Sequence, residues 1–63
     1  MRVGDLVKHI YSETYLPELN CGVVVKYKKE LDYYLVFWYG INRIEDETLC
    51  RLEVISESRR SSF

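Results

Sequence analysis

The sequence predicts a single small all-β domain, and three observations lead to this fold class. Apolar and polar residues alternate with the two-residue period of strands over most of the chain. Turn-forming residues separate these stretches at short intervals. The hydrophobic fraction of 48% is too high for a disordered chain. A chain of 63 residues leaves room for one core only, and since such a chain buries about 60% of its unfolded surface, we expect marginal stability without a partner.

The first expected strand covers residues 3–10, with a bend at Gly4, and a long loop follows at residues 11–20. Pro17 and Asn20 make this second stretch a loop, because proline is confined to edges and turns and asparagine favours turns. The expected anchors of the loop in the core are its large apolar side chains, Tyr15, Leu16 or Leu19.

A hairpin is expected next, with strands at residues 21–29 and 33–39. Three consecutive valines favour the extended state in its first strand, and Gly22 is expected to form a bend or bulge at the start. Strict alternation would place Val24 and Lys26 on the same face. The polar connection between the strands is short, so the second strand should return antiparallel to the first.

The C-terminal third is expected to hold a strand at residues 43–47, a helical turn at 48–51 and a last strand at 52–55. An alternative is a short amphipathic helix. Leu49, Leu52 and Ile55 follow one another at a spacing of three, with acidic residues in the opening turn. That alternative would convert the fold into a sheet with a C-terminal helix.

Four strings carry a resemblance to a known family: VGDLV near the start, GVVVK opening the second strand, VFWYG ending the third, and LCRLEVI near the end. In this order they resemble SH3-like small β-barrels of the Tudor and KOW type, and above all the small single-barrel proteins of tailed phages. The resemblance implies a five-stranded SH3-like barrel over residues 1–56, with a long first loop and a short helical turn before the last strand. Residues 57–63 would form a polar tail. It implies a fold and no activity.

The aromatic strand at residues 33–39 has two faces, and a domain this small has one interior. Alternation gives one face Tyr33, Leu35, Phe37 and Tyr39, and the other Tyr34, Val36 and Trp38. The resemblance favours Val36 and Trp38 as the inward or rim set. Leu35 and Phe37 would then form an exposed apolar stripe, which usually marks an interface, unless the chain itself covers them.

No catalytic, cofactor or metal site is predicted. His9 is the only histidine, and with Cys21 and Cys50 it supplies three zinc ligands at most, where about four are needed. We expect His9 to be a partly exposed structural residue, both cysteines to be free and largely buried, and the acids at residues 45–47 to form a solvated turn. A small enzyme would need a cleft that brings His9 to a cysteine.

Two surfaces are candidates for binding. The predicted protein-interaction residues form an aromatic and apolar set: Leu35, Phe37, Tyr39, Trp38, Tyr11 and Tyr15. The alternative is a nucleic-acid patch, in which lysines alternate with a stacking ring: Lys26, Tyr27, Lys28 and Lys29. The lysines have a simpler explanation, since they keep a strand edge soluble. The formal net charge of −1 also argues against a dedicated nucleic-acid binder.

The sequence thus predicts a small, non-catalytic binding or assembly module of phage-like origin. A protein partner, or a second copy in a homo-oligomer, is favoured over nucleic acid; no membrane partner and no small-molecule substrate are expected. The first ten residues lack the apolar core of a signal peptide, and no apolar run approaches the roughly 20 residues that span a bilayer. The expected location is the cytoplasm, including that of a phage-infected host, or the virion.

Overall fold

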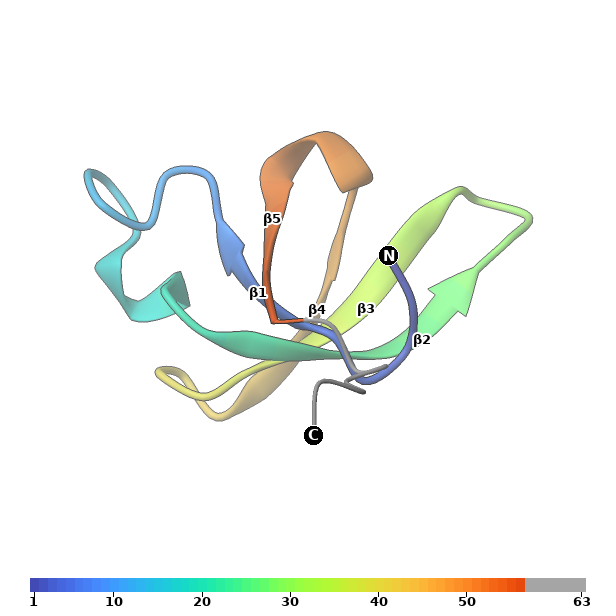
Figure 1. Ribbon diagram of the computed structural model, residues 1–63, viewed down its shortest axis with the longest axis horizontal. Helices are drawn as coiled ribbons and strands as arrows, with labels where there is room; N and C mark the ends of the chain where they lie inside the picture. Colours follow the sequence, from blue (N-terminus) through green and yellow to red (C-terminus); the bar gives the residue numbers. More distant parts are fainter. Residues whose placement is uncertain (57–63) are drawn as a thin grey trace.

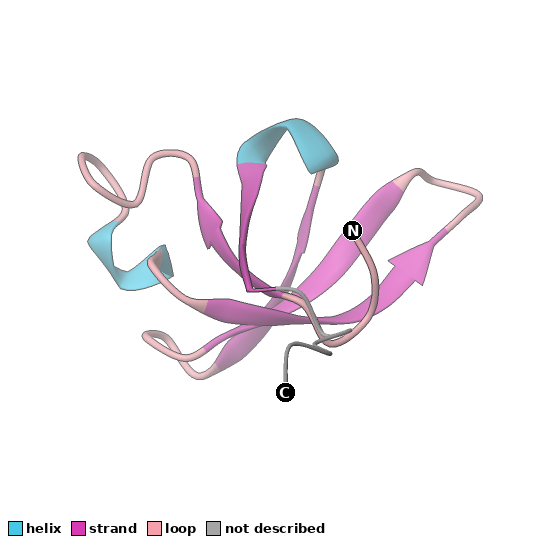
Figure 2. Ribbon diagram, in the orientation of Figure 1, coloured by secondary structure: helices cyan, strands magenta, loops and turns pink. Residues whose placement is uncertain are grey.

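A computed structural model describes residues 1–56 as one five-stranded antiparallel sheet (Figure 1). The predicted tail at residues 57–63 lies outside the described residues. The elements are β1 (Leu6–His9), the 3-10 turn η1 (Pro17–Leu19), β2 (Gly22–Lys28), β3 (Tyr33–Trp38), β4 (Arg43–Glu47), the 3-10 turn η2 (Leu49–Arg51) and β5 (Leu52–Ser56). Figure 2 shows strands joined by loops in this part of the chain, with helical geometry confined to these two turns. The all-β prediction and the turn before the last strand are confirmed, and the helical alternative for residues 45–55 is excluded.

The strand order is β4-β3-β2-β1-β5, so β4 and β5 form the two edges of the sheet. These edge strands are nevertheless joined by residues 48–51 alone. Three of these residues form η2, and a 3-10 turn rises only about 2 Å per residue. The connection is therefore too short to cross the roughly 19 Å width of a flat five-stranded sheet, so the sheet has to curl. Figure 1 shows β4 and β5 rising to meet at η2. Within residues 1–56 no ladder pairs β4 with β5, so the sheet is open.

The concave side of the curled sheet holds the core. Its buried apolar side chains are Val7, Leu19, Val24, Val36, Trp38 and Leu52. Leu16 and Leu19 reach this core from the long first loop, which confirms both as anchors. Tyr15 is 79% exposed and is not an anchor. The loop therefore closes one end of the core with aliphatic side chains and leaves both of its tyrosines, Tyr11 and Tyr15, exposed.

The inward set of β3 is the one that the resemblance favoured, because Val36 and Trp38 are both 0% exposed. Gly22 lies on the same side of the sheet, in regular register between Val7 on β1 and Trp38 on β3. The expectation of a bend or bulge at Gly22 is wrong. A Cβ atom at Gly22 would lie 2.7 Å from Trp38 Cε3, so the glycine leaves the space that the indole ring fills.

The bulge lies three residues later, at Val25. Val24 pairs with Val36, but Lys26 pairs with Leu35, so Val25 is an extra residue in β2. Val24 consequently faces the core while Lys26 faces away from it, and the expectation that they share a face is wrong. A bulge bends the strand and increases its twist, which fits the strong curl of this small sheet.

The first strand is shorter than the predicted 3–10. Gly4 has a φ of 96°, a backbone conformation that glycine adopts without steric cost. The buried carboxylate of Asp5 accepts a hydrogen bond of 2.9 Å from the backbone N–H of Arg2. These two residues form a turn, so β1 begins at Leu6.

Candidate interaction surface

The outward side of the sheet carries a continuous apolar row across four neighbouring strands. Leu6 on β1 pairs with Val23 on β2, Val23 pairs with Phe37 on β3, and Phe37 pairs with Ile44 on β4. Directly paired residues point to the same side of a sheet, so these four side chains, which we call the outer row, lie next to one another. Leu6, Val23 and Phe37 are half-buried and Ile44 is 56% exposed. Sequence periodicity found Phe37, but only the strand register reveals the other three.

A second row lies beside the outer row and is charged at both ends. Leu35 is paired with Lys26 on β2 and with Asp46 on β4. Lys26 and Asp46 are exposed, and Leu35 between them is half-buried. The chain thus places one positive and one negative group on opposite sides of a leucine, on the same side of the sheet as the outer row.

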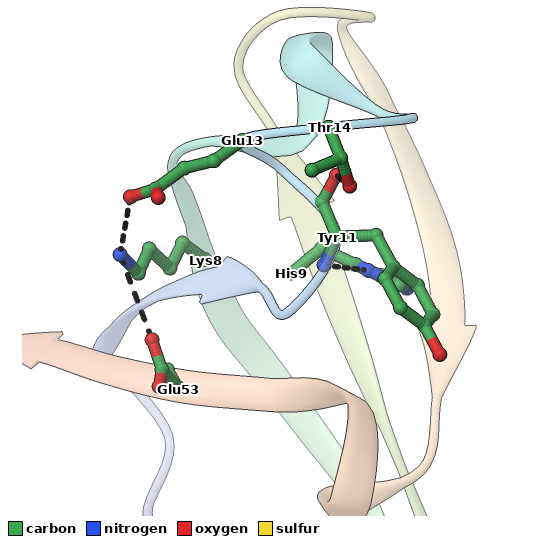
Figure 3. Close-up of polar contacts among 6 residues, drawn as sticks. All are labelled: Lys8, His9, Tyr11, Glu13, Thr14 and Glu53. Atoms are coloured by element: carbon green, nitrogen blue, oxygen red, sulfur yellow. Dashed lines mark hydrogen bonds and ion pairs between the residues drawn. The ribbon is translucent and has the colours of Figure 1, made fainter.

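On the other side of the outer row, polar and aromatic side chains border the surface. Tyr39 is 53% exposed, and its ring packs edge-on against Phe37 at a centroid distance of 5.5 Å. Lys8 on β1 lies between two carboxylates, with its Nζ 3.3 Å from Glu13 Oε2 and 3.5 Å from Glu53 Oε1 (Figure 3). The hydrogen bond to Glu13 and both negative charges raise the pKa of Lys8. An apolar centre with a polar border is the arrangement typical of protein interfaces.

The structure does not bring all six predicted interaction residues together. Leu35, Phe37 and Tyr39 share the outward face, as alternation predicted. Tyr11 and Tyr15 form a separate pair on the long loop, with ring centroids 5.7 Å apart. Trp38 is buried in the core, so its ring is not available to a partner. The candidate surface therefore reduces to the outward face of the sheet.

The lysine stretch at the end of β2 keeps its exposed charges, but its ring is already engaged. Tyr27 packs on Tyr34 at a centroid distance of 4.7 Å, and its hydroxyl donates a 3.0 Å hydrogen bond to Asp32. That hydrogen bond, with burial as a smaller cause, raises the pKa of Tyr27. Lys26 and Lys29 are exposed, and Lys28 is half-buried. A negative charge at the aromatic ring weakens the case for a base-stacking platform.

His9 and Glu47 form a buried polar pair on the core side of the sheet. The expectations of a partly exposed histidine and of a solvated acidic turn that includes Glu47 are therefore wrong. The exposed fractions of the two residues are 4% and 8%, and His9 Nε2 lies 3.6 Å from Glu47 Oε1. The backbone N–H of Tyr11 donates a 3.1 Å hydrogen bond to His9 Nδ1 (Figure 3). Nδ1 is thus an acceptor, and a neutral ring carries its proton on Nε2, toward Glu47.

Burial favours the neutral forms of both groups. It lowers the pKa of His9, with the positive charge of Arg51 acting in the same direction. It raises the pKa of Glu47, with the negative charge of Glu45 as the next cause. The indole N–H of Trp38 opposes that rise without forming a hydrogen bond of normal geometry. The pair thus joins the first strand to the edge strand β4 in a buried contact.

The histidine and the cysteines are not joined into a catalytic arrangement by any contact in residues 1–56. Both ring nitrogens of His9 face the groups just described, and the Sγ of Cys50 lies 3.3 Å from the hydroxyl of Thr48. Cys50 is exposed and Cys21 is half-buried. The thiols are free, but the expectation that they are largely buried is wrong.

One open hollow of about 260 Å³ lies where β3, β4 and η2 meet. Its lining combines both signs of charge with hydroxyl groups: Tyr33, Asp46, Glu47, Thr48 and Arg51.

In the described part of the chain, no group of three or more histidine, cysteine or acidic side chains is placed to hold a metal ion. The same residues include no helix of the length and apolarity that crossing a membrane requires.

Comparison of the chain with protein-family models, curated proteins and solved structures found no match. The fold itself defines an all-β protein, with an open antiparallel sheet whose outward side carries the outer row.

Proposed function

We propose that this protein is a small, non-catalytic binding and assembly module, and that the outward face of its sheet is the contact surface. One observation carries the proposal: four apolar side chains on four adjacent strands form the outer row, on the side of the sheet opposite the core. Contact between apolar side chains and water is unfavourable, and a partner that covers this row removes apolar area from solvent. The bordering charges would limit which partners fit.

The strand order supports the SH3-like resemblance as part of this proposal. Each strand from β1 to β4 pairs with the next, β5 pairs with β1, and a 3-10 turn precedes β5. These are features that the resemblance to SH3-like barrels implies. The phage-like origin rests on the four sequence strings alone, and the cytoplasmic or virion location rests on that resemblance and on the sequence pattern of the first ten residues; both remain predictions.

The test is a selection of peptide ligands on the wild-type protein, followed by binding measurements with two matched variants. Ile44→Lys places a charge in the outer row, whereas Leu31→Lys makes the same chemical change at the exposed turn between β2 and β3. We expect Ile44→Lys to weaken binding by at least about ten-fold, the cost of a charge left in an apolar contact. Leu31→Lys should bind as the wild type does.

Equal binding by both variants would contradict the proposal. The nucleic-acid alternative, with Lys26, Tyr27, Lys28 and Lys29, makes a different prediction for the same protein. Binding of single-stranded oligonucleotides that falls steeply with salt and is lost in Lys29→Glu would favour that alternative. We expect no such binding, because Asp32 lies against the only ring in the patch.

A further inference from the structure

The charges beside the outer row have an arrangement that a second copy of the chain would satisfy. Lys26 and Asp46 flank Leu35 on its two sides, so their backbones are about 10 Å apart, twice the spacing of neighbouring strands. Neither side chain forms an ion pair within residues 1–56. Each charge is therefore left facing outward, at an opposite margin of the same surface.

We propose that the partner of the outward face is the same face of a second copy, related by a two-fold axis that runs parallel to β3. This inference rests on the proposed function, since it assigns an occupant to the same surface. Such an axis places β2 of one copy over β4 of the other. Lys26 of each copy then faces Asp46 of the other, which forms two equivalent ion pairs.

The apolar residues follow the same symmetry. Phe37 lies over Phe37 of the second copy at the axis, and Val23 lies over Ile44. Sheets that pack face to face keep their strands nearly aligned and about 10 Å apart. A lysine and an aspartate side chain together span that distance, so the ion pairs close the margins of the contact while Val23, Phe37 and Ile44 of the outer row fill its centre.

The charges also select between the two ways in which the faces can meet. An axis that runs across the strands along the row of Leu35 would instead place Lys26 over Lys26 and Asp46 over Asp46. Like charges in close contact oppose association and suppress that arrangement. The axis parallel to β3 is the one that pairs opposite charges.

The expected contact is small. Three strands of five residues measure roughly 15 by 17 Å, so each copy would bury on the order of a few hundred Å². This lies below the roughly 800 Å² per partner of a stable interface. The dimer should therefore form reversibly, at high micromolar concentration or above.

Sedimentation velocity from about 10 μM to 1 mM protein tests the arrangement with three charge reversals. Lys26→Asp and Asp46→Lys each create two like-charge contacts, so each should weaken self-association by at least about ten-fold. An equimolar mixture of these two variants pairs opposite charges again and should form a heterodimer. Lys29→Asp, an exposed lysine beyond the paired part of β2, should associate as the wild type does.

Self-association of the wild type should also weaken as salt rises, and this measurement needs no variant. Reversals that associate as the wild type does, or a mixture that stays monomeric, would overturn the proposed arrangement. A wild type that is monomeric throughout would overturn the dimer. In that case, peptide binding that depends on Ile44 would still support the binding module. If peptide binding is also independent of Ile44, both proposals fail.

Discussion

Replacing Gly22 with alanine would insert a methyl group between fully buried side chains. Its Cβ would lie 2.7 Å from Trp38 Cε3, 2.8 Å from Val36 Cγ1 and 2.8 Å from the backbone oxygen of Phe37. Trp38 and Val36 are enclosed by the core and cannot swing into solvent, and the Phe37 oxygen belongs to the paired strand β3. The neighbours have to shift for the methyl group to fit.

Two effects set the magnitude. Overpacking a well-packed core destabilises the folded state by about 1–3 kcal/mol. Alanine in place of glycine restricts the unfolded chain, which stabilises the folded state by about 0.4–1 kcal/mol. The free energy of unfolding of Gly22→Ala should thus fall by about 1–2 kcal/mol. At about 4–8 °C per kcal/mol for a domain of this size, the midpoint of thermal unfolding should fall by about 5–15 °C.

Thermal unfolding followed by tryptophan fluorescence measures this loss directly, because Trp38 is the only tryptophan and lies beside the substitution. A double variant provides the control. Val36→Ala removes one of the three close contacts, so Gly22→Ala combined with Val36→Ala should lose less stability than the sum of the two single changes. A Gly22→Ala protein as stable as the wild type, or strictly additive losses, would refute the packing argument.

Two further predictions concern the buried pair and the long loop. Burial raises the pKa of Glu47 above its ordinary value of 4.5. As the pH rises, the carboxyl group of Glu47 therefore loses its proton in the unfolded chain before it does so in the folded chain. The folded state loses stability between pH 4.5 and the pKa of Glu47 in the folded state. Glu47→Gln should therefore be at least as stable as the wild type in urea unfolding at pH 7, and any advantage of the variant should be gone below pH 4.5. A less stable variant at pH 7 would show instead that an ion pair with His9 stabilises the fold. In Gly40→Ala, the new Cβ would clash with the backbone oxygen of Glu18, so the long loop has to move away from the turn between β3 and β4. Faster hydrogen exchange at the amide of Leu19, which donates to the oxygen of Leu16, would show this movement, and unchanged exchange would contradict it.

The strands and their inward faces were predictable because each depends on local pattern. Alternation in residues 33–39 separated Val36 and Trp38 from Leu35 and Phe37, and burial follows that division for the inward pair. The hairpin was predictable too, since a short polar connection between two extended runs leaves few other ways to pair them.

The features that the sequence did not predict depend on which strands become neighbours in the sheet. His9 and Glu47 are far apart in the sequence, and the residue type of each indicates a place at the surface. In the curled sheet, His9 Nε2 and Glu47 Oε1 lie 3.6 Å apart. The bulge at Val25 lies within a run of three similar valines, so no residue type marks its position. The outer row needs the register of four strands, which periodicity within each strand does not provide.

The most direct test of the binding proposal is to locate a bound ligand on the wild-type protein by NMR. Isotope-labelled protein would be titrated with a peptide that was selected on it, and the shifts of the backbone amides recorded. We predict that the largest shifts fall on Leu6, Val23, Phe37 and Ile44 and on their neighbours in the same face. Shifts that instead centre on the loop carrying Tyr11 and Tyr15, or on Lys29 in the turn after β2, would contradict the assignment of the outward face as the contact surface.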